Sequence, residues 1–392
     1  MLSRWTRLLP VMMIAFIIAF MDRTNIGFAI PTMGKDLNLD QSALSFASGV
    51  LFLGYVNTPT ELAVVRFLLG FFEGGIFPTM LLFVRTWFAP SERARANGVW
   101  QLAYPLAPML SGPIAGYVLE HGTWRTLFIV EGIFPIVWAA VWLWGVAASP
   151  QQARWLSPAD RDALLARLAS EAELPAAAVT GSSLAKQMAR PSVLLFTVAV
   201  FFWNIGFLGF IIWLPSVIHQ DATLSQTTVG WLSALPFAAA MVAMQFLTRW
   251  SDRTRDRRTF SAWPILICGA ILLVASLSYA GNALAVNMIL LTIAGAMLYG
   301  SQPVLWSIPG DIVPRHLAGA VSGAMNGVGV LGAFAGPFLV GYVRTATGSF
   351  SAGLGVLGGC LLLAGSLILC IREAGPSIAP VLMPEPAATL RS

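Results

Sequence analysis

The chain has 392 residues, of which 57% are hydrophobic and only 10% are charged, and its formal net charge is +5. Ordinary soluble domains carry about 25% charged residues, so this composition excludes a soluble globular protein. The basic residues lie in short connections between long apolar runs, which argues against nucleic-acid binding and predicts a protein embedded in the lipid bilayer.

Ten membrane-spanning helices are predicted from apolar runs of about 20 residues or more. The basic connections alternate with connections nearly free of Lys and Arg, so we expect both termini on the cytoplasmic side of an inner (plasma) membrane. The first run is too long for a signal peptide and should remain in the mature protein. The expected spans are 8–31, 62–88, 96–119, 125–147, 192–218, 229–248, 260–281, 284–308, 318–343 and 351–371.

The segment between the first two spans is too short for the pattern. Its apolar part, residues 43–56, cannot cross the bilayer as an ordinary helix. An internal repeat relates residues 112–118 (GPIAGYV) to residues 336–343 (GPFLVGYV), where Pro90 and Pro314 differ by 224 positions. Near the start of each half the offset is only 184, from Pro31 to Pro215. Two six-helix halves are therefore expected, with the first short by about 40 residues from its late second helix to its third.

Four segments follow from this reading. Residues 1–148 are expected to form an incomplete N-terminal helical bundle, and residues 192–373 a C-terminal bundle of six helices. Between them, residues 149–191 should form a cytoplasmic linker whose amphipathic helix starts at Ser157-Pro158, a typical N-cap and first-turn pair, and runs to about Ala172. Residues 374–392 contain four prolines and are expected to be a disordered tail.

Four ionisable residues lie well inside the first two spans: Asp22, Arg23, Arg66 and Glu73. Each costs at least about 2.5–3.5 kcal/mol at mid-bilayer on insertion scales, so they are expected to line a polar cavity. Arg66 and Glu73 share one helix face but are about 10.5 Å apart along its axis, too far for a direct ion pair. An arginine that binds an anion beside a carboxylate that carries a proton explains the set; a helix-locking ion network without ligand is the alternative.

The second half has no ionisable residue well inside its spans. It offers neutral polar side chains instead: Asn204, Gln302, Trp306, Ser307 and Asn326. We interpret the asymmetry as a division of labour, in which the first half handles charge and the second hydrogen-bonds neutral parts of a substrate. Interhelical hydrogen bonding or interfacial anchoring explains each of these residues equally well.

Cofactor, metal and enzyme motifs are absent or misleading in this sequence. Residues 327–332 (GVGVLG) match G-x-G-x-x-G, but they lie in an apolar span without the strand and βαβ unit that a dinucleotide site needs. Neither a phosphate-binding G-x-x-x-x-G-K-[ST] nor a cluster of histidines is present. We therefore expect no cofactor, no metal and no enzyme.

Several stretches resemble the major facilitator superfamily. Residues 66–75 (RFLLGFFEGG) resemble its fourth-helix R-x-x-x-G-x-x-x-G motif, and residues 249–258 (RWSDRTRDRR) its loop between helices eight and nine. Five more resemble the anion:cation symporter branch of galactonate, hexuronate, tartrate and aromatic-acid permeases: residues 21–25 (MDRTN), 87–96 (WFAPSERARA), 124–132 (WRTLFIVEG), 153–157 (ARWLS) and 203–207 (WNIGF).

The resemblance implies twelve helices in two pseudo-symmetric bundles that alternate their access to the two sides of the membrane. It implies that Asp22 and Glu73 couple protons and that Arg23 and Arg66 attract a carboxylate. The family pattern also places Asn326 at a substrate-binding asparagine of the eleventh helix, and Gln101 near a substrate position of the fifth. The family's second and third helices should follow Tyr55, where residues 57–61 (NTPTE) stand instead.

The main hypothesis is a monomeric secondary transporter that moves a small organic anion, such as a sugar acid, together with protons. The short first half motivates a second hypothesis, a transport-deficient or regulatory remnant of the same fold. A drug-type antiporter is a third, and it has less need of paired arginines in its cavity. A membrane-embedded enzyme is a fourth, and it needs a His/Asp/Glu cluster that this sequence lacks.

Overall fold

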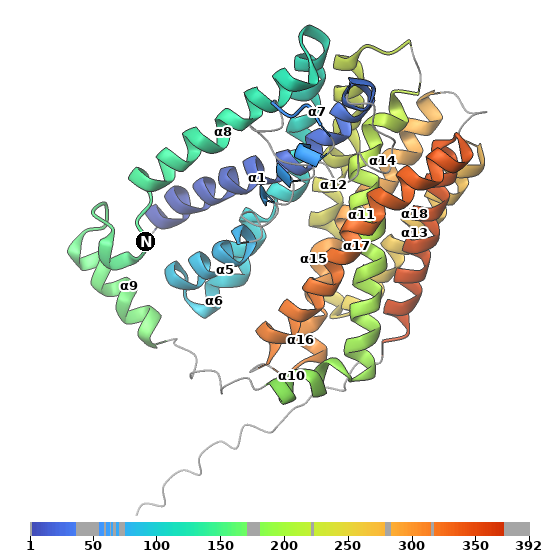
Figure 1. The fold of residues 1–392 in the computed structure, drawn as a ribbon. Helices are drawn as coiled ribbons and strands as arrows, with labels where there is room; N and C mark the ends of the chain where they lie inside the picture. Colours follow the sequence, from blue (N-terminus) through green and yellow to red (C-terminus); the bar gives the residue numbers. More distant parts are fainter. Residues whose placement is uncertain are drawn as a thin grey trace, which may run out of the picture.

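The computed structural model describes residues 2–36, 55–58, 60–62, 64–65, 68–69, 75–170, 181–220, 223–278, 284–314 and 317–371. Within these residues all regular structure is helical (Figure 1). The N-terminal half contains α1 (Leu2–Asp36), α5 (Ile76–Trp87), α6 (Pro90–Trp100), α7 (Ala103–His121) and α8 (Trp124–Gly145). The connection holds a 3-10 turn (Pro150–Gln152), α9 (Pro158–Ser170) and α10 (Gly181–Met188). The C-terminal half contains α11 (Pro191–Ile218), α12 (Gln226–Thr254), α13 (Arg257–Ser278), α14 (Leu284–Gly300), α15 (Gln302–Leu305), α16 (Pro309–Ile312), α17 (Ala318–Thr347) and α18 (Phe350–Leu369).

The predicted all-helical membrane fold is confirmed. In the described part of the chain nine helical stretches are long and apolar enough to cross a membrane, and each corresponds to a predicted span. The remaining prediction, 62–88, matches a shorter apolar helix, α5, because only Ile76–Trp87 is described as continuous helix. Residues 66–67 and 70–74 of that span lie outside the described residues.

Two spans that were predicted as continuous helices are interrupted. The 96–119 span divides into α6 and α7 because Pro105 has no N–H to bond the carbonyl of Gln101, which accepts from Tyr104 instead (3.0 Å). The 284–308 span divides into α14, α15 and α16. There Pro309 cannot bond Leu305, whose carbonyl accepts from Ile308 (3.1 Å) in a 3-10 turn. Both interruptions leave irregular backbone deep in the molecule.

The two halves meet through α1 against α11 and α7 against α12. Glycines make this approach possible. A methyl group on Gly112 of α7 would overlap the carbonyl of Gly230 of α12, and a methyl on Gly230 would overlap that of Gly112. A methyl on Gly27 of α1 would likewise meet the carbonyl of Ile212 of α11. Small residues at these positions let the helix backbones touch, as is typical of membrane helix pairs.

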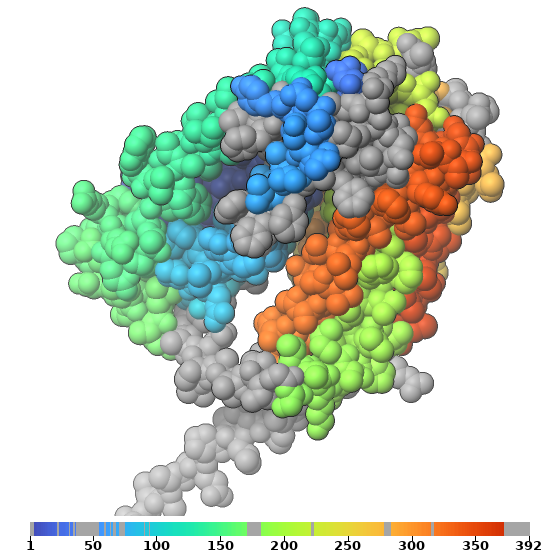
Figure 2. All heavy atoms as spheres, in the orientation of Figure 1, coloured from blue at the N-terminus to red at the C-terminus, as the bar shows by residue number. Residues whose placement is uncertain are grey.

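These contacts all lie toward one end of the molecule, which we call the closed end and define by residues 27–36, 112–123 and 212–230. Polar bonds add to it: Glu120 accepts from the backbone N–H of Thr227 (2.9 Å), and the Ser216 hydroxyl donates to the carbonyl of Gly27 (3.3 Å). At the opposite end, the linker end with α9, α10 and α16, Figure 2 shows an open space between α5–α6 and α17. The structure is therefore closed at one end and open at the other.

The connecting helix α9 is held against the N-terminal half at the linker end. Ser157 caps it by accepting from the backbone N–H of Asp160 (3.1 Å). Glu92 at the start of α6 pairs with Arg4 of α1 (2.7 Å) and with Arg167 of α9 (3.2 Å). Because Arg4 is only 3% exposed, Glu92 neutralises a buried cation as well as anchoring α9.

Replacing this shared carboxylate should destabilise the protein. In Glu92→Gln, Arg4 stays buried without its counter-charge, and we expect a loss of about 1–3 kcal/mol of unfolding free energy. Asp311→Asn is the matched control, because its pair with Arg257 (2.9 Å) is largely exposed and should contribute less than about 1 kcal/mol. Tryptophan fluorescence during thermal unfolding in detergent measures both, and equal midpoints would show that the Glu92 cluster contributes nothing special.

Candidate functional site

A set of polar and aromatic side chains lies near the middle of several spanning helices. Arg23 is near the centre of α1, and Tyr104 is near the centre of the stretch Ser91–His121. On the other side, Asn204 is central in α11 and Tyr299 in the stretch Leu284–Ile312. Helices that run alongside one another and rise about 1.5 Å per residue bring such central residues to a similar depth.

The first-half wall of this region is aromatic with one cation. The Tyr104 ring packs edge-on against Phe16 and Phe20 of α1, with ring centroids 4.8 and 5.1 Å away. The Arg23 guanidinium lies 6.0 Å from the centroid of Phe20 and interacts electrostatically with Tyr104. Arg23 is exposed and Tyr104 half-buried. An exposed arginine at this depth that interacts with a residue of α7 lies beside the space between helices, where an anion is the natural ligand.

A buried hydrogen-bond chain fixes this wall. The Thr24 hydroxyl donates to Ser111 of α7 (3.1 Å), and Ser111 donates to the side-chain oxygen of Asn25. All three residues are at most 2% exposed. Such bonds between spanning helices hold α1 in a defined rotation against α7, which also sets the direction of the neighbouring Arg23.

The second-half wall is a continuous aromatic stack without charge. The rings of Trp203 and Phe207 are stacked with centroids 4.6 Å apart, and Phe207 lies 4.7 Å from Tyr299. Phe237 of α12 packs edge-on against Tyr299 from another side at 5.3 Å. The uncharged composition of this wall agrees with the sequence-based division between a charged first half and a neutral second half.

The structure describes only part of the predicted charge cluster. Arg23 is described as above, and Asp22 precedes it in α1, but the side chain of Asp22 lies outside the described residues. Arg66 and Glu73 also lie outside them. Gln101 is half-buried at the interruption between α6 and α7, one turn before Tyr104. Thus Arg23 and Gln101 flank the tyrosine at mid-depth.

The predicted second-half residues fall into two places. The Asn204 amide donates to the carbonyl of Val200 in its own helix (3.1 Å) and packs against Gly329 of α17, three residues beyond the half-buried Asn326. Trp306 lies further toward the linker end, where its ring meets Phe196 edge-on at 6.4 Å. The substrate-binding roles of these three residues stay predictions. Tyr104 and Tyr299 were not singled out from sequence, although tyrosine is scarce in this chain, with six residues.

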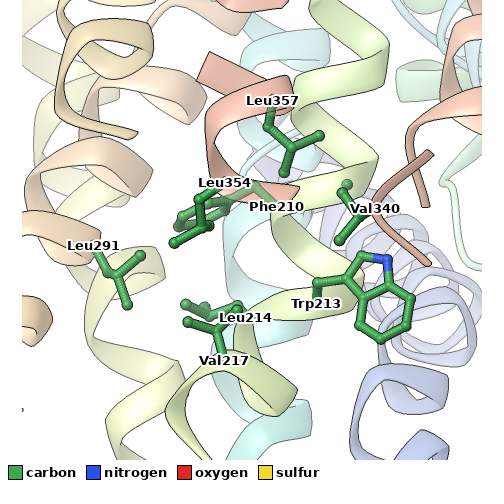
Figure 3. Close-up of a pocket in the computed structure, with 9 residues that line it drawn as sticks. Phe210, Trp213, Leu214, Val217, Leu291, Val340, Leu354 and Leu357 are labelled. Carbon is green, nitrogen blue, oxygen red and sulfur yellow. The ribbon is translucent and has the colours of Figure 1, made fainter. Parts of the chain in front are cut away.

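A separate small cavity lies between α11, α14, α17 and α18 (Figure 3). Its lining is apolar: Gly209, Phe210, Trp213, Leu214, Val217, Leu291, Val340, Leu354 and Leu357. Its one polar atom, the indole nitrogen of Trp213, donates to the carbonyl of Pro337 (3.0 Å). No side chain of this lining can neutralise an anion, so the cavity is not the candidate site. Nor do the described residues bring three His, Cys, Asp or Glu side chains into a metal-binding group.

The sequence as a whole matches a known family. Residues 44–337, about three quarters of the chain, match the Major Facilitator Superfamily. The chain belongs to this family. Its members are transporters, which agrees with the prediction of a transporter and not an enzyme. Among solved structures, this facilitator is similar to a partially occluded, inward-open conformation of the xylose transporter XylE from E. coli, with a TM-score of 0.69 and 13% identity. The likeness covers 95% of this chain and 99% of XylE, and it supports the fold alone.

Two relatives bear on the substrate. A putative tartrate transporter of Agrobacterium vitis is 31% identical, and the match covers 94% of this facilitator and 90% of the relative. A quinolone resistance transporter of Acinetobacter baumannii is 27% identical, with 89% of each chain covered. The tartrate relative aligns over 415 residues, more than the 392 of this facilitator. The aligned region therefore contains positions with no counterpart here, as expected of a shortened first half.

Proposed function

We propose that this facilitator is a secondary transporter that carries a small organic anion, a sugar acid or related carboxylate, together with protons. Arg23 carries the proposal: it is an exposed cation at mid-depth, beside the helix interface where the two halves meet. A carboxylate offers such a guanidinium two parallel hydrogen bonds and cancels its charge in a region poor in water. The tartrate relative supports an organic anion as the cargo.

The roles of the other groups follow from this assignment. Asp22 and Glu73 are proposed to bind the coupled protons, because a carboxyl group in a poorly hydrated site is readily protonated. Arg66 is proposed to join Arg23 in binding the anion, and Gln101, Asn204, Trp306 and Asn326 to contact its neutral part. Protonation of a carboxylate beside an arginine frees the arginine for the substrate, which links the two cargoes.

The orientation and organisation are part of the same proposal. The linker end carries Arg4, Arg7 and the basic α9, so we place it, with both termini, on the cytoplasmic side of a bacterial inner membrane. The state described here then opens toward the cytoplasm. We assign residues 1–148 and 192–373 to the two moving bundles of a monomer, residues 149–191 to the linker and residues 374–392 to a tail.

Uptake into proteoliposomes tests the coupling. An inward proton gradient should drive accumulation of tartrate or galactonate, and a protonophore should abolish it. Glu73→Gln should lose gradient-driven accumulation because an amide cannot bind and release a proton. Glu61→Gln, an exposed neighbour whose carboxylate accepts from the Asn57 backbone (2.8 Å), is the matched control. Undiminished coupling in Glu73→Gln would reject this residue as the proton carrier.

Export of drugs is the second candidate function, favoured by the quinolone resistance relative. The same proteoliposomes separate the two. A drug antiporter releases protons in exchange for a cationic or zwitterionic drug, does not accumulate tartrate and does not need Arg23. Failure to move either class of compound would favour the transport-deficient remnant instead.

A further inference from the structure

Tyr299 is a buried phenol whose hydroxyl has no partner. Its ring is held by Phe207 and Phe237, and the residue is 0% exposed. Among the described residues, no side chain or backbone group forms a hydrogen bond with its oxygen. A hydroxyl removed from water without a replacement bond is unfavourable, so such a group in a central position indicates a partner that this state does not supply.

Tyr104 approaches the same place from the other half. The two tyrosines interact electrostatically, and Tyr104 also interacts with Arg23. Their order is therefore cation, first phenol, second phenol, running from the charged wall to the neutral wall. A ligand whose carboxylate binds Arg23 has its next atoms beside Tyr104 and Tyr299.

Gln302 adds an acceptor beside this pair. It follows Tyr299 by three residues across a junction whose backbone at Ser301 is still helical, so the two side chains share a face. Gln302 is 5% exposed, and within the described part of the chain its side-chain oxygen has no hydrogen-bond partner. The wall thus presents an unused hydroxyl and an unused amide oxygen, which together match a group that both donates and accepts.

A hydroxyl group is such a group, since it donates one hydrogen bond and accepts others. We propose that Tyr299, with Tyr104 and Gln302, is a specificity-determining site that binds the hydroxyl next to the substrate carboxylate, so that the cargo is a 2-hydroxy acid. This rests on the proposed function and deepens it: Arg23 selects the anion, and the two tyrosines select the hydroxyl. An acid without that hydroxyl leaves the phenol and the amide unpaired.

Matched ligands test the proposal. Isothermal titration calorimetry on the purified full-length protein compares tartrate with succinate, and galactonate with 2-deoxygalactonate. The wild-type protein should bind the hydroxylated member of at least one pair more tightly. Tyr299→Phe should weaken that member about tenfold, the typical effect of one lost hydrogen bond, and leave the other member unchanged. Tyr342→Phe, at an exposed tyrosine of α17, should change neither.

The outcomes separate the two claims. Equal weakening of both members by Tyr299→Phe would show a structural role and overturn the proposal, as would a wild-type protein that binds both members equally. If Tyr299→Phe does not fold, Tyr104→Phe gives the same test at the half-buried partner. Wild-type protein that binds none of the four anions would overturn the proposed function itself, and the 2-hydroxy acid site with it.

Discussion

Arg23→Ala should lose anion binding by about 10- to 150-fold, because hydrogen bonds to charged groups contribute about 1.5–3 kcal/mol each. The guanidinium is exposed at mid-depth and interacts with Tyr104, so its loss removes the cation that faces the space between the halves. Titration calorimetry with tartrate or galactonate measures the change. Arg23→Lys should recover part of the affinity, since an ammonium keeps the charge but not the planar pair of donors.

Arg85→Ala is the control for that measurement. Arg85 is also in the first half, but it is exposed in the last turn of α5, away from the central walls. Its removal should leave affinity unchanged. Retained affinity in Arg23→Ala, with correct folding shown by an unchanged thermal midpoint, would move the anion site away from α1 and remove the main support of the proposed function.

The positions of the helices follow from hydropathy, since each of nine apolar runs corresponds to a spanning helix. The interruptions do not follow in the same way. Pro108, Pro113, Pro215, Pro236 and Pro337 all lie inside unbroken helices. Pro105 and Pro309 lie where helices divide. Neighbouring helices decide which lost backbone bond is compensated in place, and a single sequence does not contain that information.

The candidate site was predictable where one residue type is costly in the bilayer. Arg23 stands out by its charge alone, whatever its neighbours are. Tyr299 does not, because a tyrosine in an apolar span is compatible with ordinary packing, and its pairing with Tyr104 joins positions 195 residues apart. Its significance depends on a missing hydrogen bond that only the three-dimensional arrangement reveals. The same holds for Gly112, which sequence marks as part of a repeat without naming Gly230 as its partner.

Gly230→Ala should prevent the closed end from closing. The added methyl would overlap the carbonyl of Gly112, and α7 and α12 would have to separate. Overpacking of this kind costs about 1–3 kcal/mol, which shifts the balance between the two conformations about 5- to 150-fold toward the state open at this end. Transport requires both states, so uptake should fall by a similar factor. Gly112→Ala on the opposite helix should produce the same shift.

Distances between spin labels at the closed end measure this shift directly. Labels at His121→Cys and Thr223→Cys, both exposed, report on the approach of α7 to α12 in a background without native cysteines. Gly230→Ala should move their distance distribution to longer values. Gly98→Ala is the control, because a methyl there meets no atom within 4 Å among the described residues. If Gly230→Ala left both the distances and the uptake unchanged, the backbone contact between these helices would not be what holds the closed end shut. Because the contact is formed by two glycines, one on each half, a longer distance in both variants and not in the control ties the closed conformation to this crossing.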